Sequence, residues 1–554
     1  MRKIKKFLSL LSLGIVLGFT IGTTIAIYSI IANQYIQYRM FRMVTYIFQE
    51  SLYTWVILPI LPLIVVGLLG WILIRRRCEF ISRISERECI AIGRIGLALI
   101  LTVSMLHLAT IIDRRINFPK GPNVILIGVD TLRADHLGCY GYARETSPAI
   151  DKLAAEGILF QEAISHMPAT TPSFASILTS KQPISHGVLD NNYQGYSLDD
   201  QYITLGELLK NCGYNTAAFV SAWTLSPDTN LTQGFNEYNH SGLRQRQAEM
   251  VNQEVFAWLD KHKNSKFFLF IHYFDPHGRY NSPYPYNRCF DFTNQPYDIL
   301  RIPSYQRHGN ISDPSFYIAQ YDGEIKYTDY CIGQVLKKLA ELNLDRQTLI
   351  ILTSDHGETM DEHLWWFDHG CFVYEEQIHV PLLLWYPKMF TQKKINTLVR
   401  HIDILPTILD ILGINFSKGL EGYSLLPLIK GEMPKAQLVY CESARGNPTR
   451  NKKSISGIKG KQFAIRSKEW KLIMTPTPRG LDYQLYNLSQ DPQELDNLIK
   501  ENLAIVNQLK RKLGEFVQQY QSSPNYLKSI IKSGEKVVAQ KELRERLKSM
   551  GYLQ

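Results

Sequence analysis

The sequence predicts an α/β fold, with a central, mostly parallel sheet flanked by helices, N-terminal transmembrane helices and a small C-terminal antiparallel subdomain. Three long apolar stretches, at about 7–32, 52–74 and 90–112, predict the membrane part. From about residue 118, apolar runs alternate with helical segments, which is typical of a doubly wound α/β domain. After about residue 440, shorter runs indicate a separate antiparallel unit.

These changes of pattern divide the 554-residue chain into four predicted parts. A membrane region occupies residues 1–117, and a catalytic α/β domain occupies residues 118–440. A small α+β subdomain follows at 441–500, and a helical tail at 501–554 ends the chain. A chain of this length can bury at least one large core and is expected to divide in this way.

Each of the three apolar stretches is long enough to cross a bilayer, whose hydrocarbon core is about 30 Å thick. A cleaved signal peptide is the alternative for the first stretch, but its length and the missing small-residue cleavage site favour a membrane span. Basic residues crowd the N-terminus and the second loop, whereas the first loop carries only Arg39 and Arg42. Because basic loops stay in the cytoplasm, we expect an integral protein of the inner membrane, with the bilayer as a partner and the catalytic domain outside the cytoplasm.

Within the α/β part, short apolar runs bounded by turn residues predict strands, and apolar residues at helical spacing predict helices. The predicted strands are Val124–Val129, Ala217–Val220, Phe267–His272, Leu349–Thr353 and Leu382–Tyr386. The predicted helices are Ser147–Glu156, Leu205–Asn211, Gln247–Lys261, Tyr317–Asn343 and Ile404–Leu412. Pro283–Ser315 is predicted to be a long surface loop, either a substrate-facing insertion or a variable loop.

The C-terminal part has a different pattern. Phe463–Met474 and Tyr483–Leu488 predict strands of the small antiparallel unit, and Lys500–Gln521 and Ala539–Met550 predict polar amphipathic helices. These basic helices could contact lipid headgroups, but a solvated face is the favoured interpretation.

Charge and cysteine content exclude some classes of function. The net charge of +10 owes much to the flanks of the membrane spans. The soluble part has no basic stripe interleaved with aromatic residues, so nucleic acid is not an expected partner. The eight cysteines are scattered, without CxxC spacing for zinc or redox chemistry. An exported domain permits disulfides, but neither their pairing nor the oligomeric state follows from the sequence.

Two predicted strands end on side chains that bind metals. The run that begins at Asn123 stops on Asp130, and the run that begins at Thr348 stops on Asp355 and His356. In open α/β sheets, ligands lie beyond the carboxyl ends of such strands. A single strand-end Asp is more often a helix N-cap, but oxygen and imidazole ligands that converge favour a divalent cation. Calcium, magnesium, manganese and zinc are all compatible, and the number of ions stays open.

A candidate nucleophile lies between these two strand ends. In Ala169–Thr179, a hydroxyl stands just ahead of a Pro-Ser turn that leads into a helical run. Thr170 could therefore be presented at a helix N-terminus, where the dipole and the N–H groups stabilise an anion. A plain N-cap is the alternative for this segment by itself, and its position between the two ligand-bearing strands favours the nucleophile.

Together these motifs resemble the sulfatase family of the alkaline-phosphatase superfamily, in a membrane-anchored subgroup with Thr at the nucleophile position. The matching segments are Asp130–Asp135, Thr170–Ser173, His272–His277, Ser354–Glu358, Tyr374–Glu376, Asp403–Thr407, Gly422–Leu426 and Leu485–Leu488. The resemblance covers about residues 120–500, and Leu547–Leu553 is similar to the end of a membrane-linked subgroup. It implies an alkaline-phosphatase or sulfatase-like fold and a hydrolase of sulfuric or phosphoric esters.

The resemblance also implies roles for individual residues. It makes Asp130, Asp355 and His356 metal ligands, and it places Thr170 at the nucleophile position, where the hydroxyl would also contact the metal. The bound ion would be divalent, and the resemblance does not identify it.

Further residues take positions around the ester. His277 matches the family histidine that faces the leaving group, and His369 matches a Lys or His that binds the ester oxygens. Asp275 and His363 are weaker candidates. If a second metal binds, the resemblance points to Asp275, His277 and His369 as its ligands.

The departures from the family pattern concern the nucleophile. Sulfatases that use formylglycine have Cys or Ser there, Pro two residues later and Arg four residues later, whereas this chain has Thr170, Pro172 and Phe174. Thr131 replaces an Asp, and the Lys-x-His segment of many relatives has no counterpart near 219–225. Oxidation of threonine would give a ketone rather than an aldehyde, so a formylglycine mechanism is not expected.

The sequence therefore predicts a membrane-anchored, metal-dependent hydrolase that cleaves a sulfate or phosphate ester through a Thr nucleophile at an extracytoplasmic site. Phosphodiesterase chemistry is favoured over sulfuric ester hydrolysis on mechanistic grounds. One alternative is a phosphotransferase that modifies envelope lipid or glycan, like phosphoethanolamine or glycerophosphate transferases. Another is a non-catalytic binding member. The expected substrate is a sulfated or phosphorylated glycan or lipid of unknown identity.

Overall fold

The computed structural model describes residues 121–522, except for short gaps at 192–194, 243–244, 364–365, 417–418, 433–437, 447–448, 451–452 and 455–459. The three predicted membrane spans and the predicted helix Ala539–Met550 lie outside the described residues. Within the described ranges, no helix is long and apolar enough to cross a membrane. The membrane topology and the domain boundaries stay predictions.

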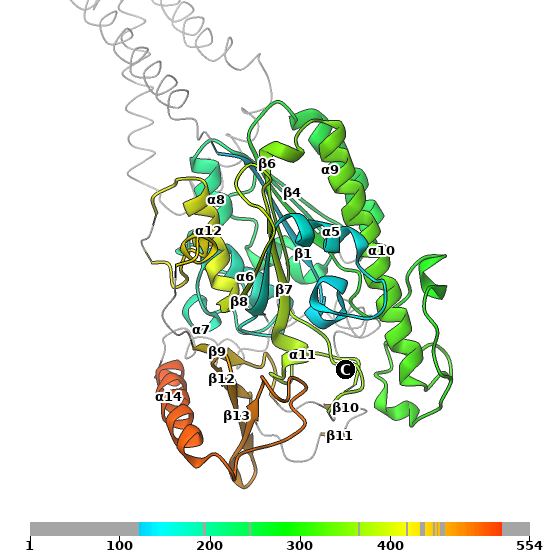
Figure 1. Cartoon of the computed structure of the whole chain (residues 1–554), viewed down its shortest axis with the longest axis vertical. Coiled ribbons are helices and arrows are strands. Elements are labelled where there is room, and N and C mark those ends of the chain that lie inside the picture. The colour runs from blue at the N-terminus through cyan, green and yellow to red at the C-terminus, as the bar shows by residue number, and fades with distance from the viewer. Residues whose placement is uncertain are drawn as a thin grey trace, which may run out of the picture. The chain divides into compact units, whose positions relative to one another are not determined.

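An eight-stranded sheet, in the order β4-β3-β5-β1-β6-β7-β2-β8, lies at the centre of the fold (Figure 1). Its strands are β1 (Asn123–Val129), β2 (Ile158–Ile164), β3 (Asn215–Val220), β4 (Glu237–His240), β5 (Phe267–Tyr273), β6 (Thr348–Ser354), β7 (His379–Trp385) and β8 (Lys393–Arg400). Neighbouring strands are parallel except at β7, which is antiparallel to both β6 and β2. The predicted α/β class with a mostly parallel sheet is confirmed.

The strands that the sequence predicted are the buried ones. β1, β5 and β6 are buried along their whole length, as continuous apolar runs in a parallel sheet should be. The sequence missed β2, β4 and β8. β2 has Gln161 and Glu162 at its centre, and β4 and β8 are polar edge strands, so their composition does not separate them from loops.

Helices cover both faces of this sheet. Side chains of α5 (Pro148–Glu156), α9 (Ala248–His262) and α10 (Pro314–Glu341) pack with Ile125 and Ile127 of β1. Side chains of α6 (Thr170–Thr179), α8 (Leu205–Asn211), α12 (Ile404–Ile411) and α13 (Leu426–Ile429) pack with Val124 and Leu126 on the other face. β1 therefore alternates its side chains between two cores, which explains its uninterrupted apolar sequence.

The predicted helices agree with the structure to within a few residues. The described residues also include two single-turn helices before the C-terminal region, α7 (Pro183–His186) and α11 (Glu375–Ile378). The predicted loop Pro283–Ser315 contains two 3-10 turns, and α10 begins near its end. The 3-10 turns are Ala134–His136, Gly138–Tyr140, Trp223–Leu225, Pro227–Thr229, Tyr286–Arg288, Ile299–Arg301, Asp345–Gln347 and His401–Asp403.

The C-terminal region forms a four-stranded antiparallel sheet, as predicted, in the order β14-β13-β12-β9. The predicted single strand Phe463–Met474 is instead two strands, because the chain turns at Ser467–Glu469. α14 packs on this sheet. The elements are β9 (Val439–Glu442), β12 (Phe463–Arg466), β13 (Trp470–Thr477), β14 (Gly480–Asn487) and α14 (Leu503–Ser522), with a two-stranded ribbon of β10 (Thr449–Arg450) and β11 (Lys453–Ser454).

A buried charge network joins this small sheet to the large one. Glu375 of α11 lies 3.1 Å from Arg466 Nη2 and 3.0 Å from Lys471 Nζ. Arg466 also pairs with Glu162 of β2. Burial acts to raise the pKa of Glu375, but the charges of Arg466 and Lys471 outweigh it and hold this pKa below its usual range. The carboxylate is therefore ionised and tied to the small sheet at neutral pH.

We expect Glu375→Gln to lower the free energy of unfolding by on the order of 3 kcal/mol, because it leaves two buried cations short of a counter-charge. Since the folded pKa of Glu375 is lowered, its contribution is complete above the unfolded pKa of about 4.3 and is lost as the pH falls below it. Urea unfolding as a function of pH measures both effects. Glu341→Gln, which breaks an exposed pair with Lys337, should change stability by less than about 0.5 kcal/mol; equal effects of the two variants would contradict the prediction.

Candidate active site

The three predicted metal ligands of the strand ends lie together. β1 and β6 are adjacent and parallel, and Val129 pairs with Ser354, so Asp130 and Asp355 leave the sheet at the same edge. His356 Nε2 is 3.4 Å from Asp355 Oδ2 and 3.9 Å from Asp130 Oδ1. All three side chains are fully buried. In the described part of the chain, this is the group of three that could hold a metal ion.

The chemistry of this group fits a divalent cation. Asp130 Oδ1 and Oδ2, Asp355 Oδ2 and His356 Nε2 are buried and have no hydrogen-bond partner among the residues described. Burial, and then the charges of Asp355 and Glu358, raise the pKa of Asp130 well above its usual range. The distances from His356 Nε2 to Asp355 Oδ2 and to Asp130 Oδ1 exceed hydrogen-bond lengths. They approach the distance of about 3.4 Å that separates two ligand atoms of a tetrahedral ion with bonds of about 2.1 Å.

The remaining polar atoms of these ligands are held in place. Asp355 Oδ1 accepts hydrogen bonds from the backbone N–H of Thr131, at 3.1 Å, and of His356, at 2.8 Å. His356 Nδ1 lies 2.8 Å from the carbonyl oxygen of Gly357. A carbonyl only accepts, so Nδ1 carries the proton and Nε2 presents its lone pair to the cluster. Thr131 has a φ of 55°, and this strained turn brings its N–H to Asp355.

The predicted nucleophile, Thr170, is the first residue of α6 and is 1% exposed. Phe174 lies one turn later on the same face of this helix. Its ring packs on β1 at Gly128, where an added Cβ would lie 2.5 Å from Phe174 Cζ. Gly128 and Asp130 are two residues apart and face the same side of the strand. α6 therefore presents Thr170 to the face of the sheet that carries Asp130.

His277 and His369 also lie beside the cluster. The ring centroids of His356 and His369 are 4.4 Å apart, and those of His369 and His277 are 5.0 Å apart. Burial lowers the pKa of both His277 and His369 well below the usual range, and the next largest effect comes from the neighbouring histidine. Both imidazoles are therefore neutral at pH 7 and add no positive charge for an anionic ester.

The two weaker candidates have other surroundings. His363 stacks on Tyr374, with ring centroids 3.8 Å apart, and its Nε2 is 3.7 Å from Glu376. The charge of Asp275 raises the pKa of Glu324 of α10, second to burial, and burial raises the pKa of Asp275 to about 7. The structure thus places His277 and His369 side by side but associates Asp275 with a different carboxyl group.

Two residues at the site have no role in the prediction from sequence. His272, at the end of β5, has its Nε2 3.6 Å from Asp130 Oδ2. Arg445 donates its backbone N–H to the carbonyl of Gly370, at 2.9 Å, and its guanidinium packs on that glycine, next to His369. His272 belongs to a matching family segment, whereas nothing in the sequence around Arg445 indicates a site. Only the docking of the C-terminal region brings Arg445 there.

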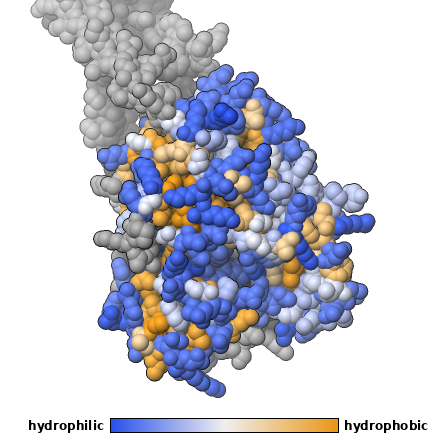
Figure 2. Space-filling model, in the orientation of Figure 1, coloured by the Kyte–Doolittle hydropathy of each residue, from blue (hydrophilic) through white to orange (hydrophobic). Residues whose placement is uncertain are grey.

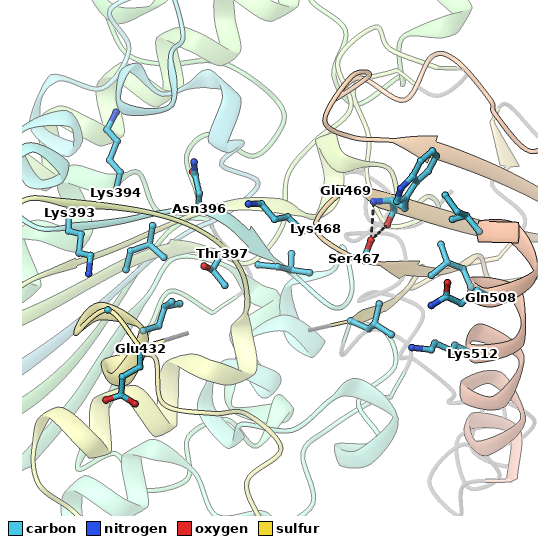
Figure 3. A pocket seen from close by; sticks show the side chains of 18 residues that line it. Lys393, Lys394, Asn396, Thr397, Glu432, Ser467, Lys468, Glu469, Gln508 and Lys512 are labelled. Atoms are coloured by element: carbon cyan, nitrogen blue, oxygen red, sulfur yellow. Dashed lines mark hydrogen bonds between the residues drawn. The ribbon is translucent and has the colours of Figure 1, made fainter. Parts of the chain in front are cut away.

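Two cavities of the described residues contain none of these side chains. One, of about 550 Å³, borders α12 and includes Leu409, Phe416 and Tyr423; apolar residues gather on the surface beside α12 (Figure 2). The other, of about 820 Å³, lies between β8 and the C-terminal sheet with α14, and four lysines surround it (Figure 3). Neither cavity is the reaction centre.

Comparison with known families agrees with this geometry. The family profile described as Sulfatase matches residues 122–414, more than half of the 554-residue chain. This chain belongs to the sulfatase family. A second profile, described as N-sulphoglucosamine sulphohydrolase, C-terminal, matches residues 361–519. The predicted family and the predicted class of enzyme, a sulfatase-family ester hydrolase, are confirmed.

Individual relatives cover most of the chain. Arylsulfatase K of Gallus gallus is 25% identical over 467 residues, which are 74% of this chain and 85% of the relative. The ulvan-active sulfatase of Formosa agariphila is 27% identical over 459 residues, which are 74% of this chain and 84% of the relative. The phosphonate monoester hydrolase of Agrobacterium radiobacter has the same fold, with a TM-score of 0.60, 22% identity and coverage of 72% and 96%.

The cluster predicts how the protein binds metal. Asp355→Asn should abolish tight binding of one divalent cation, and Asp275→Asn should not, because Asp275 lies outside the cluster. Since burial raises the pKa of Asp130, its proton must leave before a cation binds, so metal affinity should increase with pH and decrease on acidification. Isothermal titration with manganese or zinc between pH 5 and about 8 measures both effects. Loss of an ion in Asp275→Asn would instead indicate a second metal site.

Proposed function

We propose that this family member is a divalent-cation-dependent hydrolase that uses Thr170 to cleave a sulfate or phosphate ester of a glycan or lipid. The observation that carries the proposal is the position of Thr170 at the start of α6, because Phe174 of this helix packs on the sheet at Gly128, two residues before the buried, unpaired Asp130. The names of the relatives, an arylsulfatase and an ulvan-active sulfatase, support a sulfated glycan as substrate.

In the proposed reaction, Thr170 Oγ1 attacks the sulfur or phosphorus atom while the bond to the leaving oxygen breaks in line. Water then hydrolyses the threonine ester and regenerates the hydroxyl. The N-terminus of α6 contributes the positive end of its helix dipole to the anion. A divalent cation bound by Asp130, Asp355 and His356 would lower the pKa of the attacking hydroxyl and stabilise charge on the ester oxygens.

Arg445 is a cation that acts on both neutral histidines, His277 and His369. His369 stands at the position where many relatives have Lys or His, and burial keeps its imidazole uncharged. Arg445 is always protonated and lies against Gly370. We infer that its guanidinium supplies the positive charge that a lysine at position 369 would supply and binds a negatively charged oxygen of the substrate.

The identity of the nucleophile bears on the choice between the two esters. Thr170 cannot become formylglycine, so a sulfated Thr170 would have no aldehyde hydrate through which to eliminate sulfate. Hydrolysis of a phosphorylated Thr170 needs no such route. This argument favours a phosphate ester, whereas the relatives favour a sulfate ester, and the substrate assay decides between them.

Replacing Thr170 tests the nucleophile. Thr170→Val keeps the shape of the side chain and removes the hydroxyl, so cleavage should fall by about 10³-fold or more; Thr170→Ser keeps the hydroxyl and should retain activity. Wild type and variants are assayed in mild detergent on an aryl sulfate and an aryl phosphodiester, with calcium, magnesium, manganese or zinc. Activity in Thr170→Val equal to wild type would exclude Thr170 as nucleophile. A modified acceptor alcohol in place of free product would indicate a transferase.

Replacing Arg445 tests the substrate-binding cation. Arg445→Ala should raise KM about tenfold or more, because it removes a charge-assisted hydrogen bond of about 1.5–3 kcal/mol, and Arg445→Lys should recover part of the loss. Steady-state kinetics on the better of the two aryl esters measures the effect. Arg479→Ala, at an exposed residue of the β13–β14 turn, is the control. An unchanged KM in Arg445→Ala would remove Arg445 from the site.

A further inference from the structure

His272 is a fully buried histidine whose ring has no hydrogen bond. It is 0% exposed, and neither Nδ1 nor Nε2 has a hydrogen-bond partner within the described ranges. A buried polar group without a partner costs free energy that an apolar side chain would not. Its Nε2 lies 3.6 Å from Asp130 Oδ2, slightly beyond hydrogen-bond distance. His272 is thus directed at a predicted metal ligand.

The two oxygens of Asp130 face different imidazoles. Oδ1 lies 3.9 Å from His356 Nε2, and Oδ2 lies 3.6 Å from His272 Nε2. The group of ligand atoms that could hold one ion includes Asp130, Asp355 and His356 but not His272. His272 therefore approaches Asp130 at Oδ2, whereas His356 approaches it at Oδ1.

His272 packs against an apolar side chain. The ring of Phe174 contacts it edge-on, with centroids 5.2 Å apart and an interplanar angle of 84°. Phe174 fits there because position 128 is glycine, since a Cβ at that position would lie 2.5 Å from Phe174 Cζ. Phe174 occupies the position at which formylglycine-dependent relatives have Arg. An apolar ring in place of a guanidinium offers Asp130 no hydrogen bond, whereas His272 Nε2 lies 3.6 Å from Asp130 Oδ2.

We propose that His272 is a positioning residue of the metal centre, whose Nε2–H donates a hydrogen bond to Asp130 Oδ2 once a divalent cation is bound on the Oδ1 side. This inference rests on the cation of the proposed function. The donated bond fixes the rotation of the carboxylate and directs Oδ1 at the cation. Closing the gap from 3.6 Å requires a movement of less than about 1 Å. Hydrogen bonds of this kind to metal ligands contribute about 10- to 100-fold in metal affinity.

The test uses His272→Phe and His272→Gln in the full-length protein, with manganese as the probe. Phenylalanine keeps an aromatic ring against Phe174 and removes the donor, whereas glutamine retains a donor. We expect the metal-free variants to unfold at or above the wild-type midpoint, because an unpaired buried polar group is removed or exchanged. We expect the manganese Kd of His272→Phe to rise about 10- to 100-fold, with a smaller increase in His272→Gln and one ion bound in every case.

His166→Phe is the matched control. His166 is also buried without a hydrogen bond, but its charged and titratable neighbours are Arg400, His401 and His186 rather than Asp130. This variant should bind manganese like the wild type. Equal Kd values in His272→Phe and wild type would overturn the proposal, and so would the loss of a whole ion, which would make His272 a ligand.

Manganese binding by Asp355→Asn distinguishes a failure of the metal centre from a failure of the role of His272. If it abolishes manganese binding while His272→Phe does not weaken it, the metal centre stands and the role of His272 is wrong. If Asp355→Asn binds manganese like the wild type, the metal centre of the proposed function is wrong and the role of His272 fails with it.

Discussion

The close approach of two buried carboxylates at the ends of β1 and β6 is the constraint on which the rest of the site depends. The register that pairs Val129 with Ser354 forces Asp130 and Asp355 to the same edge of the sheet, where neither can reach water. Two such charges are stable together only if a proton or a cation offsets them. The raised pKa of Asp130 favours a proton as the offset. The Nε2 lone pair of His356 is directed into the cluster and favours a cation.

The C-terminal region contributes to stability and, in the proposed function, to the chemistry. The segment between β6 and β7 carries His356 and His369. Near the end of this segment, Glu375 forms ion pairs with Arg466 and Lys471 of the small sheet. Arg445, from the same region, contacts the backbone of Gly370 in that segment. The charge network and the guanidinium therefore act on one stretch of chain, so the small sheet is a structural part of the active site.

The sequence predicts what is local and misses what depends on packing. Apolar runs that end on Asp130 or on Asp355-His356 are visible because buried parallel strands need continuous apolar residues. The edge strands β4 and β8 are half-exposed and polar, so they carry no such pattern. His272 lies in an apolar run, which predicts its burial but not its neighbour. Arg445 reaches the site only through the docking of a separate sheet, and no spacing in the sequence encodes that contact.

The substitutions around the nucleophile form a consistent set, which argues for an active site of a different kind rather than a degenerate one. Phe174 needs the space left by Gly128, and its apolar ring packs against His272, whose Nε2 lies 3.6 Å from Asp130 Oδ2. A protein that only bound its ligand would gain stability by replacing the buried Asp130, His272 and Asp355 with apolar residues of similar size. Retaining these buried groups costs several kcal/mol, and a bound cation is the partner that would offset this cost.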